Sequence, residues 1–391
     1  MKYTKQTTLC FLLLAAAGVG GPAFAQSSSG GNPLQVQVDL RTVGYKPPED
    51  ELSVKEFFAN PTRAYDDHQP RMTFIDRRNL AIYFSDAVDE KAAKKSMPVS
   101  AEALPSMQAF FVDGESGALI SRKTWPTEKR SWFNERYDTQ AQLLEVEGGF
   151  LVHAGNSLAL YSPDLRKIRE MTLDAAVEWA ATVAPMGRTF FLERIDPAVQ
   201  QKAEGDWMAS DTFERLRSLD VYPGSVVSVS KDAIAGTLSK GVQCLDSQRV
   251  GESPSHLCCG DPCGYGLPLF VAEDEVVSSY SYGFRVLCTT GEVLWRREAT
   301  DPRVHLIDDC ERSMNGNRFL IRAHWNKRVV FDQTSIPKGA DAIIVYDRAE
   351  RRQVFSVISK PVDVNGLALS PDGQTLAVLS GTTLRLYRVP E

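Results

Sequence analysis

The stretch Asp363–Val389 near the C-terminus reads DVNGLALSPDGQTLAVLSGTTLRLYRV and decides the fold. It contains three short apolar runs, at Leu367–Leu369, Leu376–Leu379 and Leu384–Val389. The tetrapeptide Ser-Pro-Asp-Gly separates the first two runs, and Ser-Gly-Thr separates the second pair. Proline presets the φ of a turn, aspartate can bond back to the backbone and glycine accepts positive φ. The stretch therefore predicts a meander of three antiparallel β-strands.

This three-strand unit resembles one blade of a β-propeller of the WD40 or YVTN-like kind. Weaker copies of the unit follow one another along the sequence, and the clearest lie at residues 141–172 and 269–296. Dividing roughly 345 residues among seven units gives about 50 residues each, near the blade length of propellers. Helical patterns do not alternate with the strands, which argues against a parallel α/β sheet. We predict an all-β, seven-bladed β-propeller of four-stranded antiparallel blades, with six or eight blades, or a β-sandwich, as alternatives.

The N-terminal region supplies a strand that the last blade lacks. Val36–Tyr45 alternates between apolar and polar residues, whereas the C-terminal unit has only three strands. Pairing of this segment with Leu384–Val389 would complete the last blade and remove an open sheet edge. We therefore predict that an N-terminal strand closes the ring of a propeller domain spanning residues 36–391.

Three segments interrupt the strand pattern of the propeller domain. Residues 86–106 are polar and separate the second and third strands of the first blade. Residues 197–219 are charged and predict a helical insertion in the third blade. Residues 248–266 form a cysteine-rich loop in which the fourth blade ends. Insertions into repeats usually belong to loops on one face.

The N-terminus has the pattern of a secretory signal. Lys2 and Lys5 precede the apolar run Leu9–Val19, which is too short to span a bilayer, and Ala23-Phe24-Ala25 is a typical cleavage site. We predict that residues 1–25 are a signal peptide and that residues 26–35 are a disordered leader. The mature protein would then be periplasmic or extracellular, without an integral membrane segment.

Charge and composition narrow the class of partner. The protein has 391 residues, 43% of them hydrophobic, and a formal net charge of −6. A nucleic-acid-binding protein needs a concentrated basic face. We therefore expect no nucleic-acid partner.

The mature protein contains an even number of cysteines, which in an exported protein favours disulfides. They are Cys244, Cys258, Cys259, Cys263, Cys288 and Cys310. Sequence alone cannot choose among the about 15 possible pairings. We favour a bond from Cys244 to one of the three loop cysteines, and a second bond between Cys288 and Cys310. A zinc site built from the loop cysteines and His256 lacks the usual ligand spacing, so we expect no metal.

Two features resemble exported quinone-dependent dehydrogenases, some of which carry a vicinal disulfide beside the cofactor. Cys258 and Cys259 are adjacent, and Thr290–Trp295 is similar to the tryptophan-containing repeat of that family. The resemblance implies a quinone cofactor. That family repeats its motif around the ring, whereas the motif is clear only once here, so we expect no cofactor.

Motifs for catalysis are missing from the sequence. The five histidines show no metal-ligand spacing, and neither a G-x-S-x-G elbow nor a glycine-rich loop entering a helix occurs. We assign no catalytic residue. We expect an exported binding or scaffold protein that meets a protein or extracellular ligand at a propeller face. The alternatives are a quinone-dependent dehydrogenase or its heavy-chain-like subunit, and a hydrolase or lyase with carboxylates at the channel mouth.

Overall fold

A computed structural model describes most of the residues that follow position 33. The described residues are 34–44, 70–86, 106–127, 141–175, 177–195, 203–221, 226–236, 244–259, 268–280, 282–300, 309–325, 327–359 and 364–391. The protein divides into two units, Met1–Gly31 and Asn32–Glu391, and the described residues all belong to the second. The predicted signal peptide at residues 1–25 therefore lies outside the described residues.

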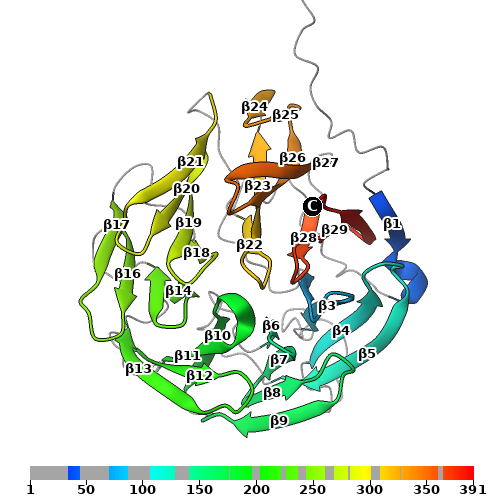
Figure 1. Cartoon of the computed structure of the whole chain (residues 1–391). Coiled ribbons are helices and arrows are strands. Elements are labelled where there is room, and N and C mark those ends of the chain that lie inside the picture. The colour runs from blue at the N-terminus through cyan, green and yellow to red at the C-terminus, as the bar shows by residue number, and fades with distance from the viewer. Residues whose placement is uncertain are drawn as a thin grey trace, which may run out of the picture. The chain divides into compact units, whose positions relative to one another are not determined.

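The first four blades are consecutive antiparallel meanders (Figure 1). Blade one contains β2 (Arg71–Phe74), β3 (Asn79–Asp86), β4 (Ser106–Asp113) and β5 (Leu119–Pro126). Blade two contains β6 (Ala141–Val146), β7 (Gly149–Ala154), β8 (Ser157–Tyr161) and β9 (Lys167–Thr172). Blade three contains β10 (Glu178–Val183), β11 (Thr189–Ile195), β12 (Ala203–Ala209) and β13 (Arg215–Val221). Blade four contains β14 (Val226–Val229), β15 (Ala233–Gly236), β16 (Cys244–Arg249) and β17 (Ser255–Cys259).

The last three blades add an inserted hairpin and a strand from the N-terminus. Blade five contains β18 (Pro268–Phe270), β19 (Glu275–Tyr280), β20 (Gly283–Cys288) and β21 (Val293–Glu298). Blade six contains β22 (Asp309–Arg312), β23 (Arg318–Trp325), β26 (Ala340–Asp347) and β27 (Arg352–Ser359), with the hairpin β24 (Val329–Phe331) and β25 (Thr334–Ile336) inserted. Blade seven contains β28 (Val364–Leu369), β29 (Thr375–Ser380), β30 (Thr383–Arg388) and β1 (Leu34–Asp39).

The innermost strands form a complete ring. Each of β2, β6, β10, β14, β18, β22 and β28 contacts the innermost strand of the next blade, and β28 contacts β2. The described residues therefore build a seven-bladed propeller of four-stranded antiparallel sheets, which confirms the predicted fold class and blade number.

The N-terminal strand closes this ring as predicted. β1 pairs antiparallel with β30, with Val36 opposite Leu386 and Val38 opposite Leu384. It begins at Leu34, inside the segment predicted as a leader, and gives way after Asp39 to the short 3-10 helix η1 (Leu40–Val43). The termini of the domain are thereby joined in one sheet, and no open edge remains on β30.

The core consists of layers between neighbouring blades rather than one central cluster. Seven clusters of buried side chains are found among the described residues, and each joins two adjacent blades. The cluster between blades five and six also includes Val329, Phe331 and Ile336 of the inserted hairpin. This hairpin therefore helps to hold blades five and six together.

The predicted helical insertion at residues 197–219 is wrong. Within it, β12 and β13 form the outer hairpin of blade three. Trp207 of β12 is fully buried, and its Nε1 donates a hydrogen bond to Ser230 O at 2.8 Å in blade four. The exposed strand β13 carries charged residues that hide the alternation expected of a half-buried strand.

A substitution at Gly205 in β12 tests whether this hairpin is closely packed. A Cβ at this position would lie 1.8 Å from Phe191 Cζ, and Phe191 is itself buried against Trp207 with ring centroids 4.7 Å apart. We expect Gly205→Ala to destabilise the protein by about 1–3 kcal/mol, because overpacking displaces these rings. Urea unfolding followed by tryptophan fluorescence measures the loss. An unchanged free energy of unfolding would contradict the close packing of β12.

Two other predicted segments differ in detail. The cysteine-rich loop at 248–266 is shorter than predicted, because β16 continues to Arg249 and β17 forms the fourth strand of its blade. Of the predicted insertion at 86–106, residues 87–105 lie outside the described residues, between β3 and β4. No helix in the described ranges is long and apolar enough to cross a membrane.

Candidate functional site

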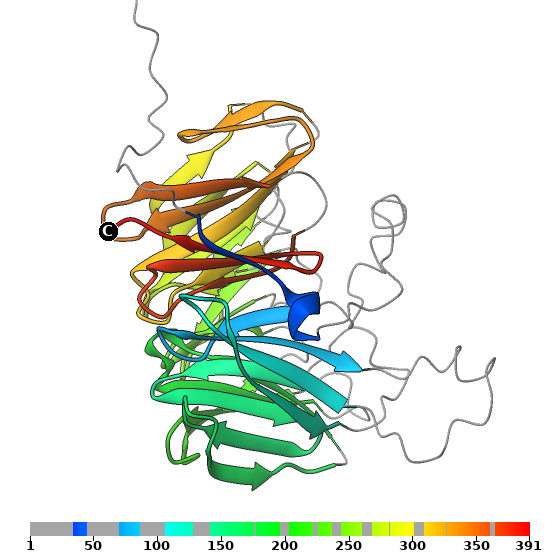
Figure 2. The same cartoon turned by 90° about the vertical axis from the view of Figure 1, so that its right-hand side faces the viewer.

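The two ends of the ring carry different connections (Figure 2). Because strands in a blade alternate in direction, the turns from first to second and from third to fourth strand lie at one end, which we call the turn face. After β1, each segment outside the described residues connects either the second strand of a blade to its third strand or one blade to the next. All turns of the turn face therefore belong to the described residues.

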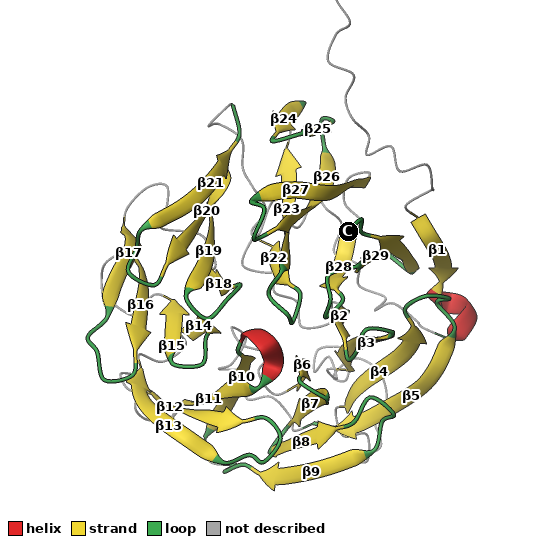
Figure 3. Cartoon of the chain, in the orientation of Figure 1, coloured by secondary structure: helices red, strands yellow, loops and turns green. Residues whose placement is uncertain are grey.

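A turn of blade three reaches across the centre of the turn face. It contains the short helix η4 (Pro185–Gly187), which lies near the middle of the ring in Figure 3. Met186 N donates a hydrogen bond to Met314 O of blade six at 2.8 Å, and Glu147 N of blade two donates one to Gly187 O at 3.0 Å. These bonds bridge the channel and leave a pocket beside the bridge.

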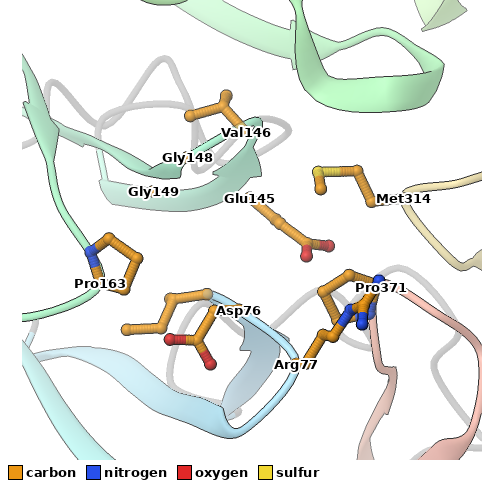
Figure 4. A pocket seen from close by; sticks show the side chains of 10 residues that line it. Asp76, Arg77, Glu145, Val146, Gly148, Gly149, Pro163, Met314 and Pro371 are labelled. Atoms are coloured by element: carbon orange, nitrogen blue, oxygen red, sulfur yellow. The ribbon is translucent and has the colours of Figure 1, made fainter.

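This pocket is a cavity of about 160 Å³ at the mouth of the channel (Figure 4). Turns of blades one, two, six and seven form its walls. Its charged residues are Asp76, Arg77 and Glu145. The apolar walls are provided by Ile75, Val146, Pro163, Met314 and Pro371.

Glu145 of β6 places a buried carboxyl group in the pocket. Its Oε1 is inaccessible to solvent and accepts no hydrogen bond from the described part of the protein. Burial raises the pKa of this carboxyl well above its usual range, and the nearby Arg312 acts in the opposite direction. The carboxylates of Asp76, Glu311 and Asp372 raise the pKa further. Burial therefore favours the neutral form of Glu145, and its Oε1 lacks a hydrogen bond from the described residues.

The other pocket carboxylates are used by the turns themselves. Asp76 Oδ1 accepts hydrogen bonds from the backbone N–H groups of Arg78 and Asn79, at 2.7 and 2.6 Å, and its Oδ2 accepts one from Asn79 Nδ2. Asp372 Oδ1 similarly accepts bonds within its own turn, and its Oδ2 lies 3.8 Å from Arg77 Nε. These carboxylates shape the turns, whereas Glu145 Oε1 accepts no hydrogen bond from the described residues.

Arg312 crosses the channel beside Glu145. It lies in β22 of blade six, and its Nη2 donates a hydrogen bond to Val183 O of blade three at 2.8 Å. Burial lowers its pKa to about 10, opposed by the carboxylates of Glu145, Glu311 and Glu273. Arg312 therefore stays charged at neutral pH and joins opposite sides of the ring.

The buried carboxyl predicts a pH-dependent stability difference for Glu145→Gln. A carboxyl whose pKa is raised by folding stabilises the folded state at low pH, and this contribution is lost as the pH rises above about 4.3 towards the raised pKa. Glutamine does not titrate. We therefore expect Glu145→Gln to gain stability over the wild type with rising pH, by up to about 1.4 kcal/mol per pH unit.

Urea unfolding at pH 5, 6, 7 and 8 measures this difference. Glu147→Gln is the matched control, because Glu147 is exposed on the same turn and pairs with Arg188. A difference between Glu145→Gln and wild type that stays constant with pH would show that Glu145 is not desolvated.

Glu145 and Arg312 belong to none of the motifs considered from the sequence. The structure brings them together from blades two and six, 167 positions apart by their residue numbers. One local signal was present: Glu145 immediately precedes the buried Val146 in an innermost strand. A charged residue at that place in a strand that lines the channel is a candidate for a function.

The cysteines lie in blades four, five and six. Cys244 of β16 is disulfide-bonded. Cys258 and Cys259 lie in β17, whereas Cys263 falls outside the described residues. The predicted bond between Cys288 and Cys310 is wrong, since neither belongs to a disulfide. Cys288 is the last residue of the third strand of blade five, at the turn face. Cys310 lies near the start of β22, at the opposite face.

The register of blade four identifies the partner that we expect for Cys244. Cys244 is paired across the strands with Cys259. A bond between them would close a loop of about 15 residues, worth about 3 kcal/mol in the chain-entropy account. We expect non-reduced peptide mapping by mass spectrometry to find a Cys244–Cys259 bond. A bond from Cys244 to Cys258 or Cys263 would contradict the pairing.

Cys244 also belongs to a group of possible metal ligands. Among the described residues, ligand atoms of Cys244, Asp246 and His256 lie within 4.8 Å of one another. His256 Nδ1 is 2.5 Å from Asp246 Oδ1. A sulfur held in a disulfide is not a thiolate and does not ligate a metal as one. The group shares only His256 with the zinc ligands considered from sequence.

Comparison with solved structures aligns this protein with the C-terminal WD40 domain of Sif2. The sequence identity is 12% and the TM-score 0.42, over 83% of this chain and 97% of that chain. No protein-family model matches the sequence, and no curated protein matches it. The class therefore rests on the topology itself: the protein is a seven-bladed β-propeller.

Proposed function

We propose that the protein is exported and acts as a binding propeller that receives a protein partner at the turn face. The signal pattern in residues 1–25 and the disulfide at Cys244 support export, because disulfides persist in oxidising compartments. The observation that carries the binding proposal is the Glu145 carboxyl in the channel-mouth pocket, whose buried Oε1 accepts no hydrogen bond from the described residues. A buried polar group without a partner calls for an explanation, and a bound ligand is one.

The hydrolase or lyase alternative has less support. Carboxylates do gather near the mouth, as that hypothesis requires. However, glycoside hydrolysis needs two carboxyl groups available to the substrate. Asp76 and Asp372 already accept hydrogen bonds within their own turns, so Glu311 is the one remaining carboxylate, of the three that raise the pKa of Glu145, that could act as a second acid or base.

The quinone-dependent alternative also has less support. Trp295, the tryptophan of the motif that resembles that family, packs between blades five and six with Phe284 and Tyr346. This position gives it a role in the core rather than in holding a cofactor. We therefore favour partner binding.

Site-specific photo-cross-linking tests the proposed face. Gly148 lies in the turn between β6 and β7 at the pocket, and Gly381 lies between β29 and β30 at the opposite face. Both have positive φ, and an added Cβ would meet nothing within 4 Å at either position. A photoreactive residue at Gly148 is expected to cross-link a partner in the exported fraction, whereas one at Gly381 is not. Equal yields, or cross-links only from Gly381, would overturn the proposal.

A further inference from the structure

The size and walls of the channel-mouth pocket suit one side chain rather than a whole small molecule. Its volume of about 160 Å³ is below the roughly 300–1,000 Å³ of pockets that hold drug-sized ligands. Apolar walls surround a carboxyl group (Figure 4). A lysine side chain has the matching form, with an aliphatic stem and a charged head.

The charges around the pocket favour a cation. The carboxylates of Asp76, Glu311 and Asp372 act on Glu145 together with the cation Arg312, and a second cation in the pocket lining, Arg77, lies 3.8 Å from Asp372. Arg312 Nη2 donates a hydrogen bond to Val183 O. A buried oxygen that lacks a hydrogen bond is unfavourable, and more so when its group is charged. A positively charged donor at Oε2 would stabilise the carboxylate, because its negative charge is shared by both oxygens.

The geometry of Glu145 distinguishes between the two basic side chains. Oε1 is inaccessible to solvent, although the residue as a whole is only partly buried. The carboxyl therefore presents only its other oxygen, Oε2, to the pocket. Arginine binds carboxylates best through two parallel bonds, which need both oxygens, whereas an ammonium acts as a point charge. One available oxygen favours lysine.

We propose that the pocket takes the side chain of a lysine from the partner protein, with its ammonium group bonded to the Glu145 carboxyl and its stem between the apolar walls. The inference rests on the proposed function and names the group that the turn face recognises. The Glu145 carboxyl transfers its proton to solvent when the ammonium enters, and the resulting carboxylate pairs with the ammonium. Affinity for lysine therefore rises with pH over the range in which the unbound carboxyl is protonated.

Titration calorimetry of the mature protein with short peptides tests this inference. The probe is acetyl-Gly-Gly-Lys-Gly-Gly-amide. Its controls are the same peptide with norleucine, which keeps the stem but lacks the ammonium, and with arginine. The lysine peptide is expected to bind at least tenfold more tightly than either control, with an affinity that increases as the pH is raised. Glu145→Gln is expected to lose at least tenfold in affinity, whereas Glu147→Gln keeps the wild-type value. Circular dichroism confirms that both variants are folded.

Three results would overturn the inference. They are equal affinity for the lysine and norleucine peptides, unchanged affinity in Glu145→Gln, and no binding of the lysine peptide at millimolar concentration. A fourth arm uses n-butylamine, which has the lysine ammonium and stem without a peptide. If n-butylamine binds as tightly as the lysine peptide, the site recognises free amines, and a partner's lysine is the wrong source.

Failure of the lysine inference can be distinguished from failure of the proposed function, because the peptide titration and the cross-linking experiment give different outcomes in the two cases. A cross-link at position 148 that forms equally in Glu145→Gln would overturn the lysine inference and support the protein partner. Lysine-peptide binding without any cross-link at position 148 would support the pocket's chemistry and overturn the protein partner.

Discussion

A protein that begins at Leu40 is expected to lose cooperative folding, whereas one that begins at Gln26 folds. Without β1, the edge of β30 is left open, and the cluster between blades seven and one loses Val36 and Val38. β1 also contacts blade one directly, since a Cβ at Gly117 would lie 2.3 Å from Val38 Cγ2. An open edge invites aggregation, and the lost apolar contacts remove several kcal/mol. Thermal unfolding and size-exclusion chromatography of the two proteins measure the effect.

Two point variants distinguish the effect of lost packing from the effect of shortening the protein. Val38 packs against the cluster between blades seven and one, whereas its neighbour Gln37 is exposed on the other side of β1. Val38→Asp is expected to destabilise the protein, because it places a charge against apolar side chains. Gln37→Asp introduces the same residue on the exposed side and is expected to change stability by about 0.5 kcal/mol or less. Equal effects of the two variants would contradict the closure of the ring by β1.

Phe284→Ala is expected to destabilise the protein by about 3–5 kcal/mol. Phe284 is fully buried where blades five and six and the inserted hairpin meet. Its ring centroid lies 4.9 Å from that of Tyr346, 5.3 Å from Trp295, 5.6 Å from Phe319 and 6.4 Å from Phe331. Removing the ring leaves a cavity that packed aromatic neighbours cannot readily fill.

Guanidinium unfolding followed by far-UV circular dichroism measures this loss. Val293→Ala is a suitable control, because Val293 lies in β21 of the same blade and is 46% exposed. The control is expected to change stability by about 0.5 kcal/mol or less. A loss below about 1 kcal/mol for Phe284→Ala would mean that the hairpin does not pack on blade five.

The turns made the fold predictable from sequence. Ser370-Pro-Asp-Gly373 is a complete turn signal, and in the structure Ser370 Oγ bonds Asp372 while Gly373 adopts a φ of +73°. Such signals are local, so they identify hairpins without knowledge of the partner blades. Closure by β1 was predictable for another reason, since the last blade lacked one strand and the N-terminus offered one.

The outer hairpin of blade three and the candidate site were not predictable in this way. The propensity of β12 is weakened by Gly205 and by charges, and it is a strand because Trp207 packs against blade four. Glu145 and Arg312 become neighbours only when the ring closes and brings blades two and six to the same channel. Neither residue has a sequence spacing that could reveal this juxtaposition.

A crystal structure of the mature protein with acetyl-Gly-Gly-Lys-Gly-Gly-amide tests most directly that the channel mouth is a binding site. We predict that the lysine stem lies between Ile75, Val146 and Met314 and that its Nζ is within hydrogen-bond distance of the Glu145 carboxyl. An empty pocket at saturating peptide, with the Glu145 carboxyl bonded to another group of the protein, would contradict the account.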